Sequence, residues 1–307
     1  MVKRLASRSF GQILLAVGTL LFSLAILAFL LYRERDQLLQ IQWRFDPILI
    51  AGAFLAYLVG LGVVALVWAD MMRCFGSTLP YTTHIEYFCL SHLAKRLPGT
   101  VWYLAGRTYL YKQAGDSLRL VTFASSIEIL IMIVSGVLTS LLFTGYSLTE
   151  LTPLPWWGWI GLAVIGLLLL HPRTLHYAVR RFNVKSLPTL RYRRLWLWIG
   201  LYSIPWIIGG IVLYLIANLV TVVSLTHLPY LIGSWSLVGT LSFLVFFLPT
   251  NLGFSEVGLS LLLVTIIPSA LAVVIAIVNR IVLLISEIVG IGLVLLLIRV
   301  VRGREIA

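Results

Sequence analysis

Long apolar runs separated by short polar connections repeat along the whole chain. A helix needs about 20 mainly apolar residues to cross the hydrocarbon core of a bilayer, which is roughly 30 Å thick. Eight stretches approach or exceed this length, near residues 10–32, 47–71, 120–145, 155–171, 195–223, 231–249, 252–268 and 270–298. The fourth and seventh are short, as tilted or re-entrant segments are. The pattern predicts an all-α, polytopic integral-membrane bundle of about eight spans.

One polar segment, residues 80–119, fits neither a span nor a short loop. It is too long for a tight connection and too polar to cross the membrane unaided. Its aromatic residues alternate with His84, His92, Lys95, Arg96 and Arg107. Proline removes a backbone donor and glycine frees the backbone, so Pro98-Gly99 is expected to end one helix and start a turn. We predict two short helices, broken at that dipeptide, at or inside the membrane interface.

The distribution of charge predicts the orientation of the spans. Only 11% of the residues are charged, against about 25% in soluble domains, which leaves no room for a soluble domain. Nineteen of the 23 Lys and Arg residues precede the first stretch, follow the last, or lie in the second and fourth connections. By the positive-inside rule these regions are cytoplasmic. We therefore expect a multi-pass protein of the plasma (inner) membrane with both termini in the cytoplasm.

A second break, Pro249–Gly253, separates the sixth and seventh stretches. The span order makes it cytoplasmic, yet it holds no Lys or Arg, which favours a position sunk in the membrane. Non-helical backbone at that depth must pack in protein or line a watery cavity. Interrupted segments in both halves, 1–145 and 155–300 of a single transmembrane domain 1–307, are typical of transporters whose halves form an inverted repeat. Interrupted helices also serve as packing devices, so both interpretations stay open.

Charged residues within the apolar stretches form the candidate site. Charges in a membrane are costly and are usually paired or functional. Arg280 lies near the middle of its stretch and needs a carboxylate or a bound anion, for which Glu256 and Glu128 are the candidate partners. Glu287 follows two turns later. Two interpretations stay open: ion pairs that fix helix register, or a lipid-phosphate site in which Glu128, Glu256 and Glu287 balance charge or take up protons.

The two breaks add candidate ligands for such a phosphate. Half-helix N-termini present unpaired N–H groups and a positive dipole end to an anion, and arginine can bind phosphate through two hydrogen bonds. Positive-inside anchoring is the alternative role for the basic residues near the first break. The predicted phosphate-binding residues are Lys95, Arg96, Pro98, Gly99, Arg107, Asn251, Gly253 and Arg280.

Several other kinds of chemistry lack a signal in the sequence. No Walker-type nucleotide loop, HExxH or GxSxG motif occurs. Cys74 and Cys89 lie fifteen residues apart on the predicted cytoplasmic side, where thiols stay reduced, and no matched histidine pair accompanies them. The basic residues lie in short loops, as topology determinants do, rather than in a nucleic-acid patch. We predict no metal site, no cofactor, no disulfide and no nucleic-acid partner.

Two short motifs resemble those of a known family. Leu93-Ala-Lys-Arg-Leu-Pro-Gly-Thr-Val-Trp102, continuing to Gly106-Arg107, resembles the "K-x-LPG-x-x-W…GR" segment of the transmembrane, flippase-like region of lysylphosphatidylglycerol synthases. Leu248–Glu256 resembles that family's "P-x-x-x-G-x-x-E" segment, and Glu128 and Arg280 resemble family positions that carry an acid and an arginine.

The resemblance implies a bundle with re-entrant segments that serves lipid translocation or lipid-linked glycan pathways. Full-length synthases add a cytoplasmic aminoacyltransferase domain, and this sequence has no counterpart, so lysyl transfer to phosphatidylglycerol is not expected. Thr250 and Asn251 stand where family members often have small residues or glycine. This departure leaves the substrate open.

Our leading hypothesis is a flippase-like lipid translocase. It would move an anionic phospholipid or a polyprenyl-phosphate-linked glycolipid between leaflets. One alternative is a membrane-embedded transferase acting on a polyprenyl-phosphate sugar, with Glu128 or Glu256 as base, although an enzyme is the less favoured class. The other is an accessory subunit that binds a membrane synthase or glycosyltransferase. The sequence leaves self-association into a homo-oligomer open.

Overall fold

The structure is a computed structural model, which describes residues 46–94, 101–145, 155–171, 173–175, 192–244 and 254–306 and a few isolated positions. Every regular element in this part of the chain is a helix, which confirms the predicted all-α membrane bundle. The predicted first span, 10–32, lies outside the described residues apart from Phe29 and Tyr32. The two breaks, Pro98-Gly99 and Pro249–Gly253, also lie outside them.

Four helices are long and apolar enough to cross a membrane: α3 (Pro47–Cys74), α6 (Leu118–Thr144), α10 (Tyr192–Val220) and α13 (Ser269–Ile306). They match four of the predicted spans, 47–71, 120–145, 195–223 and 270–298. Each carries exposed leucine, isoleucine or valine side chains on its outer face, as helices in contact with lipid do. The chain is therefore a membrane protein.

Local sequence signals set where these helices begin. Asp46 caps α3 by accepting a hydrogen bond from Ile48 N–H at 2.8 Å, and Pro47 follows at the first helical position. Ser117 caps α6 in the same way through Leu120 N–H at 3.1 Å. Both caps replace a backbone partner that the first turn of a helix lacks.

Short helices fill the space between the long ones. The first hairpin consists of α4 (Tyr81–Ala94) and α5 (Val101–Gln113), and the second of α11 (Leu228–Leu244) and α12 (Phe254–Leu263). A single turn, η2 (Leu225–His227), precedes α11. A further helix, α8 (Trp156–Leu169), packs along α6 and corresponds to the short fourth predicted span.

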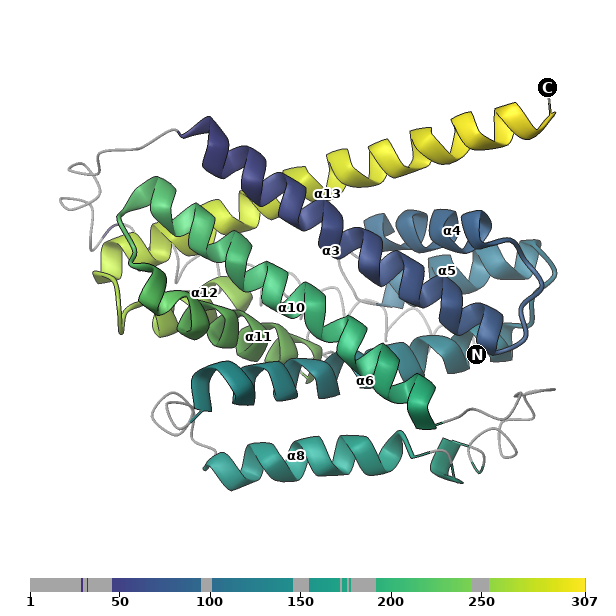
Figure 1. The fold of residues 1–307 in the computed structure, drawn as a ribbon, viewed down its shortest axis with the longest axis horizontal. Helices are drawn as coiled ribbons and strands as arrows, with labels where there is room; N and C mark the ends of the chain where they lie inside the picture. The colour runs from purple at the N-terminus through teal and green to yellow at the C-terminus, as the bar shows by residue number, and fades with distance from the viewer. Residues whose placement is uncertain are drawn as a thin grey trace, which may run out of the picture.

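The order of long and short helices is the same in two parts of the chain. In each, a long helix leads into a hairpin and the hairpin into a second long helix: α3–α4–α5–α6, then α10–α11–α12–α13. Contacts follow the same scheme, because α4 packs on α13 while α11 packs on α6, and the two leading helices pack on each other. Figure 1 shows α4 and α5 towards one end of the bundle and α11 and α12 towards the other.

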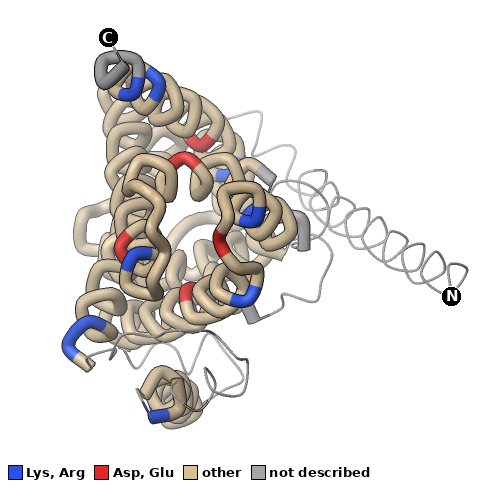
Figure 2. The backbone as a smooth tube through the Cα atoms, turned by 90° about the vertical axis from the view of Figure 1, so that its right-hand side faces the viewer, with Lys and Arg blue, Asp and Glu red and all other residues tan. Residues whose placement is uncertain are grey.

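These two ends differ in charge. We call the basic end the one where α3 ends and α6 and α10 begin. Among the described residues its cations are Arg73, Lys112, Arg119, Arg173, Arg193, Arg194, Arg299 and Arg302. At the opposite, neutral end, where α3 begins and α13 begins, the described residues include no lysine or arginine. Figure 2, turned so that the basic end faces the viewer, shows Lys and Arg on several helix ends. The first hairpin starts and finishes at the basic end.

The described arms of the second hairpin enter from the neutral end and extend about halfway along α6. Ser140 of α6 donates to Gly233 O at 3.3 Å. One turn further into the bundle, a Cβ on Gly136 would lie 2.1 Å from Thr240 Oγ1. Helix α11 therefore runs antiparallel to α6, and its last residue, Leu244, comes level with the middle of α6.

Helix α12 then returns towards the neutral end. The Tyr230 hydroxyl, near the start of α11, donates to Leu262 O at 2.9 Å, near the end of α12. The sequence predicted apolar stretches at 231–249 and 252–268, the second of them short enough to be re-entrant, with a break sunk in the membrane between them. The described helices agree with a re-entrant arm, because α12, with 10 residues, rises only about 15 Å.

Labelling of single cysteines tests this arrangement in a variant without Cys74 and Cys89. We expect a membrane-impermeant thiol reagent to label cysteines at exposed Thr78 and Thr226 from opposite sides of the membrane, because these positions flank the two hairpins. A cysteine at Ser255 should resist labelling from the Thr78 side, since it lies at the inner end of α12. Two full spans would put Ser255 at that surface, so its rapid labelling there would contradict the hairpin.

Candidate functional site

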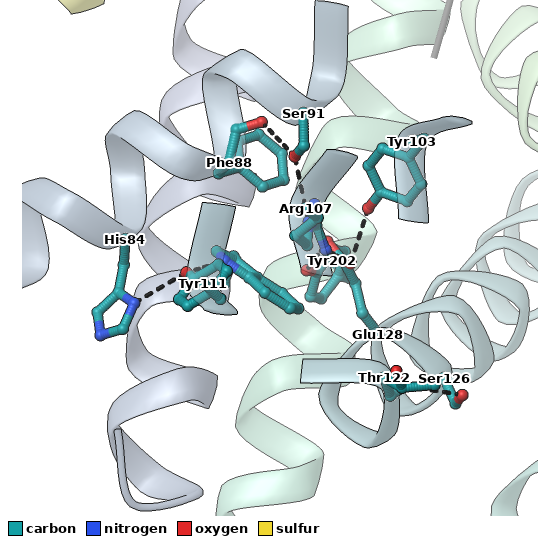
Figure 3. Close-up of polar contacts among 11 residues, drawn as sticks. His84, Phe88, Ser91, Tyr103, Arg107, Tyr111, Thr122, Ser126, Glu128 and Tyr202 are labelled. Atoms are coloured by element: carbon teal, nitrogen blue, oxygen red, sulfur yellow. Dashed lines mark hydrogen bonds and ion pairs between the residues drawn. The ribbon is translucent and has the colours of Figure 1, made fainter. Parts of the chain in front are cut away.

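A buried ion pair joins the first hairpin to the following long helix. Arg107 of α5 and Glu128 of α6 have side chains that are 0% and 1% exposed, and Arg107 Nη1 donates to Glu128 Oε2. Arg107 Nε also donates to Ser91 Oγ on α4 at 3.2 Å. This contact ties both arms of the hairpin to the same guanidinium, as Figure 3 shows.

Two tyrosines complete the surroundings of the Glu128 carboxylate. Tyr103 of α5 donates its O–H to Oε2 at 2.9 Å, and Tyr202 of α10 donates to Oε1 at 3.1 Å. With Arg107, three donors from two helices therefore satisfy a carboxylate that has no access to water. Such saturation is what makes an ionised group tolerable in a membrane interior.

Aromatic rings hold the Arg107 guanidinium in place. Its Cζ lies 3.8 Å from the ring centroid of Trp68, 4.4 Å from that of Tyr103 and 5.3 Å from that of Phe88. All three distances are within the range of cation–π attraction. The sequence led us to expect Arg107 at the interface beside the first break, whereas the structure buries it completely. A phosphate could reach it only if this cluster came apart.

A second ion pair joins the second hairpin to α13. Arg280 Nε lies 3.4 Å from Oε1 of Glu256, which belongs to the first turn of α12. Glu256 is therefore the partner of Arg280, and Glu128, the other candidate, is bound to Arg107. The Arg280 side chain is 30% exposed, so this arginine is far more accessible than Arg107.

A third pair connects the first hairpin to the same long helix. His92 Nε2 of α4 lies 3.6 Å from Glu287 Oε1 of α13, and the Glu287 side chain is 1% exposed. The His92 ring stacks on Phe88 with centroids 5.2 Å apart. Each of the three pairs thus joins an arm of a hairpin to one of the long helices that follow the hairpins.

Three residues of these pairs, Tyr103, Tyr202 and His92, were not predicted as site residues from the sequence. Tyr103, Tyr202 and His92 take part in the buried pairs, but nothing in their spacing singles them out, because their partners lie on other helices. The one signal was the dense alternation of aromatic and basic residues in segment 80–119. Six predicted ligands lie outside the described residues: Lys95, Arg96, Pro98, Gly99, Asn251 and Gly253.

Neither cysteine forms a disulfide, and both are buried. The described part of the chain contains no group of three or more His, Cys, Asp or Glu side chains that could hold a metal ion.

Near the basic end, three buried side chains form a hydrogen-bonded chain. The Trp68 indole N–H donates to the Tyr111 hydroxyl at 2.9 Å, and that hydroxyl lies 2.9 Å from His84 Nδ1. Since the tyrosine oxygen already accepts from Trp68, its own proton is available for a neutral histidine. Burial, with a smaller contribution from Arg73, lowers the pKa of His84 from 6.5 to about 4, while Asp116 opposes the shift.

An exposed ion pair at the basic end offers a contrast to the buried ones. Arg194 of α10 donates to Asp70 of α3 at 2.7 Å, and the Trp198 indole donates to the same carboxylate at 2.8 Å. The Arg194 and Asp70 side chains are 45% and 29% exposed, so water screens this pair. It joins α3 to α10 and makes no contact with the Arg107–Glu128 pair.

No family model and no curated protein matches the chain. The resemblance to the flippase-like region of lysylphosphatidylglycerol synthases therefore stays a prediction.

Removing the Glu128 charge should destabilise the fold severely. In Glu128→Gln, Arg107 would remain buried without its counter-charge, which costs about 3–5 kcal/mol in comparable pairs. Thermal unfolding in detergent measures the loss. Asp70→Asn is the matched control, because breaking an exposed pair costs about 1 kcal/mol or less. Equal losses in the two variants would contradict the structural role of Glu128.

The buried His84 should make stability depend on pH. The unfolded chain takes up a proton at His84 near pH 6.5, whereas the folded protein does so only near pH 4. The unfolded state therefore binds more protons in this window, and stability falls as pH drops from about 6.5 towards 4. His84→Gln should flatten the dependence of the unfolding temperature on pH across this window, and an unchanged slope would exclude His84 as its source.

Proposed function

We propose that this chain is a flippase-like translocase of the plasma (inner) membrane, with both termini in the cytoplasm. Its cargo is an anionic phospholipid or a polyprenyl-phosphate-linked glycolipid. The observation that carries the proposal is the partly exposed Arg280 in the interior of a membrane-crossing helix, paired with a carboxylate at the inner end of a re-entrant hairpin. Charged residues at such depth line the paths of substrates and ions in membrane proteins.

The arrangement of the two hairpins supports transport. Secondary transporters commonly place their substrate near the bilayer midplane, between broken helices from two repeats of opposite direction. Here α4–α5 enters from the basic end and α11–α12 from the neutral end, and the described arms of both reach the central part of the long helices. A group bound between them is closed off from one face by each hairpin, as alternating access requires.

The charges favour an anionic head group. Arginine matches a phosphate with two parallel N–H donors, and no described hydrogen bond engages the terminal nitrogens of Arg280. The Arg280 side chain as a whole is 30% exposed. Arg107 is enclosed by aromatic rings and bound to Glu128, so we assign it to fixing the first hairpin rather than to holding cargo.

Nothing observed favours the transferase alternative. A general base must be able to accept a proton from the substrate. Glu128 already accepts three hydrogen bonds and is sealed from solvent, which leaves Glu256 as the candidate. Glu256 is in turn held by Arg280, with Arg280 Nε 3.4 Å from Glu256 Oε1.

A flux assay in liposomes tests the proposal. The purified protein is reconstituted with phosphatidylglycerol that carries a fluorescent label, and an impermeant quencher reports its movement between leaflets. Arg280→Ala should lower the rate at least tenfold, because no other exposed cation among the described residues lies at that depth. Arg280→Lys should retain part of the rate, since it keeps the charge and loses the planar fork.

The matched control is Arg194→Ala, which removes an ion-paired arginine at the basic end and should leave the rate unchanged. Folding of each variant is checked by thermal unfolding before the assay. Unchanged flux in a folded Arg280→Ala protein would overturn the proposal. Product formation from a polyprenyl-phosphate sugar without exchange between leaflets would replace it by the transferase function.

A further inference from the structure

The two ion pairs of the hairpins occupy corresponding places with the charges exchanged. Glu128 lies ten residues after the start of α6 at Leu118, and Arg280 lies eleven residues after the start of α13 at Ser269. In α3–α6 and in α10–α13 alike, the partner comes from the second arm of the preceding hairpin. Glu128 pairs with Arg107 from α5, and Arg280 pairs with Glu256 from α12. Each pair thus fixes the returning arm of a hairpin to the next long helix.

The two pairs differ in how firmly they hold. Arg107 and Glu128 are both fully buried and are bound further by Ser91, Tyr103 and Tyr202. Arg280 makes a 3.4 Å contact through Nε, which is longer than the 2.7–2.9 Å of a well-formed charged hydrogen bond. Its side chain is also 30% exposed. The first pair is built to stay closed, and the second can open at much lower cost.

We infer that Glu256 is an internal counter-anion, which occupies Arg280 in the empty site and which the anionic head group must displace. The inference rests on the proposed function, because it takes Arg280 as the cargo site. Exchange of one anion for another leaves the net charge beside Arg280 unchanged. A head group without an anionic oxygen cannot take over this charge, so Glu256 excludes neutral lipids.

Displacement of Glu256 also releases the inner end of α12. Glu256 lies in the first turn of α12, and its contact with Arg280 is an ion pair between that end of the helix and α13. Once the head group holds Arg280, that attachment is lost and the first turn of α12 can move away from α13. The rest of the second hairpin stays packed, because α11 lies against α6 and α10 and the later part of α12 lies against α13. The first hairpin keeps its attachment through Arg107, so the first turn of α12 is the part that moves on binding.

Lipid binding to four proteins tests the counter-anion. The probe is dihexanoyl-phosphatidylglycerol, titrated against the detergent-solubilised full chain and followed by native mass spectrometry, with dihexanoyl-glycerol as the neutral probe. Glu256→Gln should bind the anionic probe about tenfold more tightly than the wild type, because the competitor for Arg280 is gone. Arg280→Ala should lose the binding, and Asp70→Asn should match the wild type.

The outcomes separate this inference from the proposed function. Binding that depends on Arg280 but has equal affinity in the wild type and Glu256→Gln would overturn the counter-anion and leave the translocase standing. Equal binding by the wild type and Arg280→Ala would overturn both the counter-anion role of Glu256 and the proposed translocase function. Tight binding of the neutral probe by the wild type would also contradict the role of Glu256 in selecting anions.

A second measurement uses the unmodified protein and does not depend on the folding of a variant. Hydrogen–deuterium exchange is followed in peptides that cover α12 and α5, with and without dihexanoyl-phosphatidylglycerol. We expect the lipid to raise exchange at least threefold in the first turns of α12 and to leave α5 unchanged. Equal changes of exchange in the two helices, or slower exchange in α12, would contradict a release of the inner end of α12.

Discussion

The Glu128 carboxylate sits deep in α6, and the way its charge is neutralised constrains much of the bundle. An ion of this size loses several kcal/mol of hydration when it leaves water, even after the surroundings relax. Glu128 recovers this through Arg107, Tyr103 and Tyr202. Two of these donors lie on α5, which follows the first break, so the first hairpin must enter the bundle far enough for α5 to reach Glu128. The third fixes α10 against α6 at the same depth.

Helices α10–α13 also hold a charge in the interior of a long helix, but this charge is positive and has fewer hydrogen-bond partners. Arg280 takes the place of the buried acid, and Glu256 comes from the returning arm of the hairpin. Ser255 donates to Glu256 Oε2 at 3.0 Å, but among the described residues no aromatic ring stacks on Arg280 as Trp68, Tyr103 and Phe88 do on Arg107. A charge that is only partly satisfied in a membrane is a favourable place for an external ligand of the opposite sign. Of the two corresponding arginines, Arg280 is therefore the less enclosed one.

Opposite directions of entry explain why the charges gather in the middle. On the described arms of the two hairpins, Arg107 and Glu256 meet their partners in the interior of α6 and α13. His92 and Glu287 follow the same logic, since they join the inner part of α4 to α13. Non-helical backbone at this depth needs protein or a hydrated cavity around it. The three pairs Arg107–Glu128, Arg280–Glu256 and His92–Glu287 therefore stabilise the packing of the hairpins on the long helices.

The sequence by itself determined the helices and the presence of a membrane, because hydropathy and length report what surrounds each segment. It also identified Glu128, Glu256, Arg280 and Glu287 as charged residues that need partners, because a charge in an apolar stretch is unusual. Tertiary structure alone decided that Arg107 pairs with Glu128 and is buried, and that α12 returns along α11 with Tyr230 bonded to Leu262. The physical reason is that a charge's partner and a helix's depth depend on which helices pack together, and neighbouring residues in the sequence carry no record of those contacts.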